Sequence, residues 1–240
     1  MTTLHNKSVS VNVRGVEIKL MAYTRSLELC AKMNYETENL DFIDSIAPGE
    51  VLYDLGGCEG RFSIYAALKH IKVLSLEPEN KNFKVFNENI ALNNLNPDSI
   101  EVLNCGIGAT EAKGTLKIGQ PWAGGHQKVI DHAEVRNDLN FDFKETQEIT
   151  IVSLDNIAFS GKYPFPDYLK IDIDGSEMPF MAGAERTLQS PSLKGIIFEL
   201  NKEDVNYATI LKLLKSYHFN IIKEYPIPNE PTLFNIIFRK

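Results

Sequence analysis

The sequence predicts an α/β fold in which helices cover a mostly parallel sheet. Short apolar segments alternate with helical patterns along the 240 residues, as expected for parallel strands that are buried on both faces. Three of these segments run into a carboxylate, at Asp54, Glu77 and Asp172. The last two strand patterns flank a short Pro-rich turn, which favours an antiparallel hairpin at one edge of the sheet. We expect an N-terminal extension, residues 1–47, packed on a main domain that spans residues 48–240.

Composition and charge narrow the functional classes. The chain is 43% apolar and 24% charged, which is ordinary for a globular protein with one sizeable core. The net charge is −7 without any block of lysine and arginine, which disfavours nucleic acid or an anionic membrane as a partner. The three cysteines form no C-x-x-C pair, and no segment has the apolar length of a membrane span or of a signal peptide. We therefore expect a reduced, cytoplasmic protein.

The N-terminal extension is predicted to begin with a hairpin. Residues 8–23 alternate apolar and polar side chains around Arg14-Gly15, a pattern typical of two short strands laid outside a main sheet. Helical patterns follow at 26–33 and 38–46. Pro48-Gly49 ends the second helix before the first core strand.

The turn after the first core strand carries the strongest functional signal. A buried strand is expected from Val51 to the acid Asp54, and Gly56, Gly57 and Gly60 follow before a helical pattern begins. Glycines allow positive φ and a close approach of the backbone to a ligand, and free N–H groups at a helix start attract anions. The spacing matches neither the dinucleotide fingerprint nor the P-loop. What remains is acid-x-Gly-x-x-x-Gly, beginning at Asp54.

A second buried strand, expected at 73–76, precedes Glu77. Glu77 follows Asp54 by 23 residues, close to the spacing of about 20 for an acid that binds a ribose hydroxyl pair. A carboxylate suits this task because it accepts two hydrogen bonds side by side. A helix is expected next, over 80–92.

The middle of the chain is less regular. Asn104 follows a third predicted strand, where its amide can meet an adenine edge or simply form a turn. From residue 120 to 145 the periodicity fades, and long irregular segments in compact domains are often lids or substrate loops. This segment contains Trp122, which is placed to flank a pocket, and His126. A histidine there can act as a base, although a lone loop histidine is more often only solvated.

A second informative block follows a strand expected over 148–154. Asp172 lies on a strand expected at the centre of the sheet, and Asp174 leads into a helix expected over 176–188 that includes Glu177. Carboxylates gathered at the end of a core strand are costly unless a ligand, metal or cation uses them. They can also cap the helix or hold Mg²⁺; we assign no metal.

The last part of the chain predicts how the sheet ends. A fifth buried strand is expected at 195–201 and a helix at 204–217. Two strands, at 219–225 and 233–239, then form the closing hairpin.

The chain resembles the FkbM family of class I S-adenosylmethionine (SAM)-dependent methyltransferases. The resemblance extends from Asn34 to about Asn201 and rests on Tyr35-Glu36 upstream of Pro48-Gly49, the loop Asp54–Ser63, Leu76-Glu77-Pro78, and Ser153-Leu154-Asp155 followed by Leu169–Glu177. The chain departs from the family pattern at Gly57-Cys58, where Ala-Asn is usual, and at Asp174, where Glu is common.

The resemblance implies a Rossmann-like domain with a seven-stranded, mostly parallel sheet, whose closing hairpin Rossmann-type dehydrogenases lack. It implies SAM as the cofactor and methyl transfer to a hydroxyl oxygen of a small molecule or a saccharide. The cofactor contacts would come from Glu36, Asp54, Gly56, Gly57, Cys58, Gly60, Glu77, Asn104 and Asp172. Because a hydroxyl must lose its proton, candidate catalytic residues are Glu177, Asp174 and His126, with Asp172 near the reacting end.

Three other functions compete with a methyltransferase of this family. Asp172-Ile173-Asp174-Gly175 also resembles the nucleophile motif of haloacid-dehalogenase phosphatases, but the further acidic pair that this family needs is missing. Methylation of a nucleic-acid base is disfavoured by acidity and by the absence of an Asn/Asp-Pro-Pro-aromatic sequence. A non-catalytic SAM-fold binding or scaffold protein stays open, because the loop departs from the family pattern and fold alone does not fix function.

Overall fold

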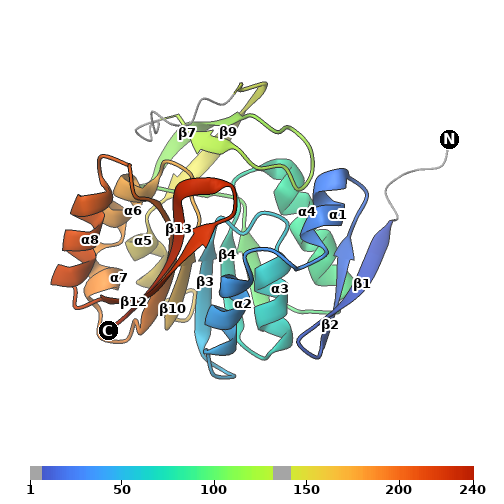
Figure 1. The fold of residues 1–240 in the computed structure, drawn as a ribbon, viewed down its shortest axis with the longest axis horizontal. Helices are drawn as coiled ribbons and strands as arrows, with labels where there is room; N and C mark the ends of the chain where they lie inside the picture. The colour runs from blue at the N-terminus through green and yellow to red at the C-terminus, as the bar shows by residue number, and fades with distance from the viewer. Residues whose placement is uncertain (1–6, 132–141) are drawn as a thin grey trace.

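A seven-stranded sheet forms the centre of the computed structural model, which describes residues 7–131 and 142–240 (Figure 1). The strand order is β12-β13-β11-β10-β3-β4-β5. The strands are β3 (Val51–Leu55), β4 (Lys72–Leu76), β5 (Ile100–Leu103), β10 (Tyr168–Ile171), β11 (Gly195–Asn201), β12 (Asn220–Ile227) and β13 (Glu230–Arg239).

Strand directions confirm the predicted topology. Strands β5, β4, β3, β10 and β11 pair in parallel, whereas β13 is antiparallel to both β11 and β12. Every residue of β3 is buried. Its side chains alternate between the two faces, so that Leu52 joins one hydrophobic core and Tyr53 the other. The near-continuous apolar character of this strand follows from that two-sided burial.

Helices cover both faces of the sheet (Figure 1). Helices α2, α3 and α4 contribute to the core on one face, and α5, α6, α7 and α8 to the core on the other. The helices are α1 (Arg25–Cys30), α2 (Thr37–Asp44), α3 (Arg61–Leu68), α4 (Asn80–Leu92), α5 (Leu154–Ala158), α6 (Glu177–Gly183), α7 (Glu185–Gln189) and α8 (Tyr207–Ser216). None of these described helices combines the length and the apolar composition needed to cross a membrane.

The helix predicted over 176–188 is two helices in the structure. Helices α6 and α7 meet at Ala184, whose φ of −123° and ψ of 8° are not helical. A Cβ on Gly183 would lie 2.2 Å from the carbonyl oxygen of Gly108. The break therefore occurs where the chain packs directly against another backbone segment, which local periodicity cannot reveal.

The predicted N-terminal hairpin is confirmed as a separate two-stranded sheet, β1 (Ser8–Val13) and β2 (Val16–Met21). Asparagine side chains at helix α4 form hydrogen bonds with strand β2 of this hairpin. The Asn89 side chain accepts a hydrogen bond from the Met21 N–H (2.7 Å), and Asn93 accepts one from the Lys19 N–H (2.9 Å).

A second, four-stranded sheet lies above one end of the main sheet (Figure 1). Its order is β6-β9-β7-β8, and its strands are β6 (Gly106–Ile107), β7 (Ala112–Ile118), β8 (Lys128–Ile130) and β9 (Glu145–Val152). The prediction of an irregular segment over 120–145 is thus wrong at β8, which is only three residues long and depends on pairing with β7. The part of that segment over 132–141 lies outside the described residues.

Candidate functional site

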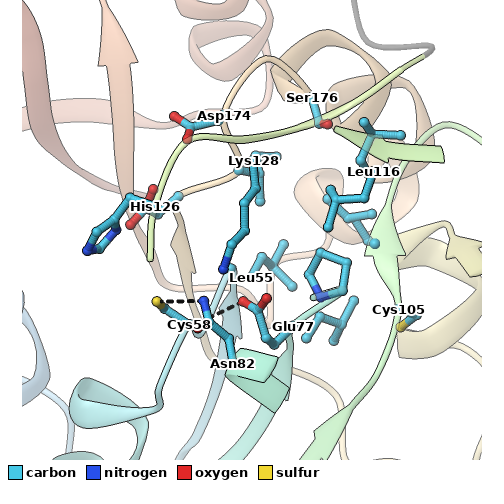
Figure 2. Close-up of a pocket in the computed structure, with 18 of the residues that line it drawn as sticks. Leu55, Cys58, Glu77, Asn82, Cys105, Leu116, His126, Lys128, Asp174 and Ser176 are labelled. Carbon is cyan, nitrogen blue, oxygen red and sulfur yellow. Dashed lines mark hydrogen bonds between the residues drawn. The ribbon is translucent and has the colours of Figure 1, made fainter. Parts of the chain in front are cut away.

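A cavity with an empty volume of about 680 Å³ lies where strands of the main sheet end and the small sheet begins (Figure 2). Residues at the carboxyl ends of β3, β4 and β10 line one side, including Leu55, Leu76 and Asp172. Leu116 of β7 and Ile130 of β8 line the other side. Ligands of open α/β sheets bind at this edge, outside the carboxyl ends of the strands.

Asp54, on the strand that precedes the glycine loop, is a buried carboxylate with partners on two other elements. It is 1% exposed, and its Oδ2 accepts a hydrogen bond from the Ser63 hydroxyl (2.7 Å). Its Oδ1 forms an ion pair with Lys170 of β10 (3.1 Å). Burial acts to lower the pKa of Lys170, but the Asp54 and Asp172 carboxylates outweigh it and raise that pKa above its ordinary value. Asp54 therefore connects β3 to α3 and β10 without lining the cavity itself.

The loop glycines are required by their surroundings. Gly56 and Gly60 both have a φ of +85°, which favours glycine. A Cβ on Gly56 would lie 1.8 Å from the carbonyl oxygen of Asp172, and one on Gly60 would lie 2.3 Å from the Phe86 ring. Gly57 is similarly crowded. Of the three, Gly56 lines the cavity, so bare backbone faces whatever binds there.

Glu77 lies at the end of β4, where the sequence predicts a ligand-binding acid, and it lines the cavity. It is 4% exposed, and its two oxygens accept hydrogen bonds from the N–H groups of Cys58 and Glu79, both at 2.9 Å. Burial raises the pKa of Glu77 to about 7, with the cationic Lys128 acting in the opposite direction. Each carboxylate oxygen has a second lone pair, so Glu77 can still accept bonds from a ligand.

Sequence reasoning missed two residues of the cavity, Lys128 and Asn82. The amine of Lys128 points toward Glu77 in Figure 2 and lies 3.2 Å from Oε2 of Glu79. The Asn82 amide donates to the Cys58 sulfur at 3.0 Å and to the Gly125 carbonyl at 3.2 Å. Lys128 lies in a segment without periodicity, so no signal marked it. For Asn82 the only signal was its place in the first turn of α4.

The acidic block after β10 is divided between two pockets. Asp172 and Asp174 line the cavity, and Asp172 lies 3.6 Å from the Lys170 amine. Glu177 lines a separate, smaller pocket beside α8, and its Oε1 accepts a hydrogen bond from the Gly175 N–H (3.1 Å). The structure therefore brings two of the three acids together at the cavity. Among the described residues, no group of three or more His, Cys, Asp or Glu side chains is arranged to hold a metal ion.

Glu36 and Asn104 are not among the residues that line the cavity. Glu36 accepts a hydrogen bond from Arg61 at 2.6 Å, and the buried Arg61 guanidinium also pairs with Glu59 at 3.0 Å. Asn104 donates to the carbonyl oxygens of Glu77 (3.1 Å) and Pro78 (3.2 Å). Both residues thus contact segments that shape the site.

His126 lines the cavity and also borders a neighbouring pocket. Its backbone N–H donates to the Gln120 side chain (3.1 Å). The His126 residue is exposed. Desolvation by neighbouring segments lowers the pKa of His126 below the ordinary value, while the Glu59 and Asp172 carboxylates act to raise it. A histidine with a lowered pKa is neutral near pH 7 and is able to accept a proton.

Comparisons with known proteins agree with this geometry. Residues 54–221 match the model of the methyltransferase FkbM domain. The fold is similar to the crystal structure of a methyltransferase FkbM from Methylobacillus flagellatus KT (TM-score 0.55, 16% identity), covering 81% of this chain and 44% of that chain. It is also similar to Aeropyrum pernix fibrillarin with natively bound S-adenosyl-L-methionine (TM-score 0.54, 8% identity, 97% and 83% covered). A third similar structure is Trm5b from Pyrococcus abyssi (TM-score 0.52, 14% identity, 97% and 55% covered).

These identities are low, so the structural similarities establish the fold alone. The chain spans less than half of the Methylobacillus flagellatus protein, at 44% of its length. No curated protein matches the sequence.

Proposed function

The chain belongs to the FkbM family of SAM-dependent methyltransferases, and from that premise we propose that it methylates a hydroxyl oxygen of a small molecule or a saccharide. The observation that carries the proposal is the meeting of the glycine loop, Glu77 and Asp172 around one cavity. When bound, SAM supplies an electrophilic methyl group on a positively charged sulfur.

The cavity fits such a cofactor in three respects. Gly56 leaves no room for a Cβ and presents bare backbone to the ligand. Glu77 has free lone pairs for a ribose hydroxyl pair. Asp172 and Asp174 place negative charge where a cationic methionine end is favoured, and the apolar surface of Leu116 and Ile130 suits an adenine ring.

Most of the other predicted cofactor residues support the residues that contact SAM in this proposal. Asp54 fixes the start of α3, and Gly57 and Gly60 shape the loop. Cys58 lines the cavity itself and also fixes Glu77 through its N–H. Glu36 acts through Arg61, and Asn104 acts through the backbone that follows β4.

We assign the proton transfer to His126. A hydroxyl acceptor of high pKa needs a base within hydrogen-bond reach. His126 lines the cavity, and its pKa is lowered. Asp174, which also lines the cavity, is the second candidate. Glu177 borders a separate pocket, so we assign it no step.

Calorimetric titration with SAM and with S-adenosylhomocysteine tests the cofactor assignment. We expect both to bind in the micromolar range, and we expect Glu77→Ala to weaken SAM binding by about tenfold or more, the loss of a charged hydrogen bond. Glu203→Ala, which removes an exposed glutamate, is the matched control. Absence of binding to the wild-type protein would favour the scaffold reading instead.

The reaction itself can be tested with radiolabelled SAM and cell extract. We expect label on an oxygen atom of a small product, and we expect His126→Gln to abolish labelling while leaving SAM affinity unchanged. Label on nitrogen or carbon would contradict transfer to a hydroxyl.

A further inference from the structure

A second and more open pocket lies beside the cofactor cavity, between α1 and the segment 120–126. Its empty volume is about 1380 Å³, and His126 borders both spaces. A molecule held in this pocket would therefore lie next to the cavity in which we place the cofactor.

Hydrogen bonds and close packing connect the two walls of this pocket, the α1 region and the segment 120–126. The indole N–H of Trp122 donates to the Ser26 hydroxyl (2.8 Å), and the Thr24 hydroxyl donates to the Ala123 carbonyl (2.7 Å). Gly124 packs so closely on α1 that a Cβ there would lie 2.8 Å from the Leu27 side chain. The pocket is thus formed before any ligand binds, which reduces the ordering cost of binding.

The charge of this pocket is opposite to that of the whole protein. Arg25 and Lys32 line it, and the described lining residues include no carboxylate, whereas the chain carries a net charge of −7. Glu28, the carboxylate on the same helix, is paired with Lys7. An anionic group is therefore favoured in this pocket.

The remaining lining residues suit a polar ring. Trp122 is 43% exposed and Leu29 is 45% exposed, so each presents apolar surface to the pocket. Asn34 and Gln120 lie on the same lining and carry amides that can bond hydroxyl groups. Apolar and aromatic surface with a few polar groups is typical of small-molecule sites.

We propose that this pocket binds the methyl acceptor and that the acceptor is a carbohydrate bearing a carboxylate or phosphate group. This inference rests on the proposed function. The sugar ring packs on Trp122, and Arg25 and Lys32 bind the anion, for which guanidinium and ammonium groups are well suited. The hydroxyl to be methylated then faces His126.

Trp122 offers a direct test because it is the single tryptophan of the chain. Its emission therefore reports on this pocket alone. With S-adenosylhomocysteine present, the full chain is titrated with glucuronate, glucose 6-phosphate and glucose. We expect at least one anionic sugar to change the emission and to bind about tenfold or more tightly than glucose, and the two anionic arms separate carboxylate from phosphate recognition.

Charge variants identify the binding residues. We expect Arg25→Gln and Lys32→Gln each to weaken the binding of the anionic sugar by about tenfold, without changing the calorimetric affinity for SAM. Lys212→Gln on α8 removes the same charge from an exposed position on another helix and should change neither measurement.

Three results would overturn the proposal: no change in emission with either anionic sugar, equal affinity for glucose, or unaltered affinity in both variants. A failure of SAM to bind would instead contradict the proposed function. The two failures are separate because calorimetry with SAM and emission with sugars are independent measurements.

Discussion

Glu77 is a carboxylate that the fold buries between a helix cap and the glycine loop. Burial raises its pKa to about 7 from the ordinary value of 4.5, against the opposing effect of Lys128. Because the folded protein favours the protonated form, the contribution of Glu77 to stability is fully present below pH 4.5 and is lost as the pH rises toward about 7. Binding a ribose hydroxyl pair requires the ionised form as an acceptor. The same residue is thus less stabilising at the pH where it binds better.

We predict that SAM affinity rises as the pH increases from about 6 to about 8, since Glu77 ionises over this range. Calorimetric titration across this range measures the effect. Lys128→Met should move the rise to higher pH, because it removes a cation that lowers the pKa of Glu77. Glu77→Gln should bind weakly at every pH, and a rise of equal size in this variant would contradict the assignment.

The loop glycine Gly56 permits a second prediction, with Gly49 as its control. Both have strongly positive φ, +85° and +88°, but a Cβ on Gly56 would lie 1.8 Å from the Asp172 carbonyl, while a Cβ on Gly49 would meet nothing within 4 Å. Gly49→Ala should therefore lower the free energy of unfolding by only about 1–2 kcal/mol, the cost of left-handed backbone. Gly56→Ala should lower it further and abolish SAM binding, as measured by chemical denaturation and calorimetry. Equal losses in the two variants would show that the contact with Asp172 is unimportant.

At the scale of elements, α4 connects the glycine loop to the segment that covers the cavity. Asn82 in its first turn is 1% exposed. It donates to the Cys58 sulfur and the Gly125 carbonyl, and it accepts from the Gly124 N–H at 2.8 Å. One side chain thereby links α4 to the Cys58 side chain of the glycine loop and to the backbone of Gly124 and Gly125.

We predict that Asn82→Ala lowers the free energy of unfolding by about 1–3 kcal/mol, because it leaves the buried N–H of Gly124 without a partner. Amide hydrogen exchange of Gly124 and Gly125 should accelerate. Asn87→Ala, which alters an exposed asparagine on the same helix, should have little effect on either measurement. Unaltered exchange in Asn82→Ala would contradict the proposed connection.

Helices and strands whose own residues carry a regular apolar pattern were predicted well. Helix α4 and strand β11 match the predicted ranges 80–92 and 195–201, and β3 (Val51–Leu55) extends one residue beyond the predicted run 51–54, because their apolar patterns are regular. Glu77 could be placed at the cavity because residues that follow neighbouring parallel strands must share one edge of the sheet.

Features that depend on distant partners were not predicted. Strand β8 exists through its pairing with β7, and Lys128 reaches the cavity only through that pairing. The separation of Glu177 from Asp174 follows from the turn before α6, which three-residue spacing does not determine. Local sequence therefore predicts the main sheet, whereas tertiary pairing decides which side chains meet at the cavity.

At the scale of the whole molecule, the cavity lies between two sheets that have separate cores. Leu55 and Leu76 belong to a core of the seven-stranded sheet, whereas Leu116 and Ile130 form part of the core of the four-stranded sheet. All four line the cavity. A ligand that fills it would contact both sheets at once and would stabilise their arrangement.

We therefore predict that SAM protects the small sheet as well as the glycine loop from hydrogen exchange. A ligand at about 100 times its Kd stabilises the folded state by about 2.7 kcal/mol, and amides of β7 and β8 that exchange by local opening should slow with it. The β1–β2 hairpin, which packs on α3 and α4, is the internal control and should change little, and Glu77→Ala should show weaker protection at the same SAM concentration. Thermal stabilisation by SAM without slower exchange in β8 would mean that the ligand contacts the main sheet alone, and that the small sheet covers the cavity without taking part in binding.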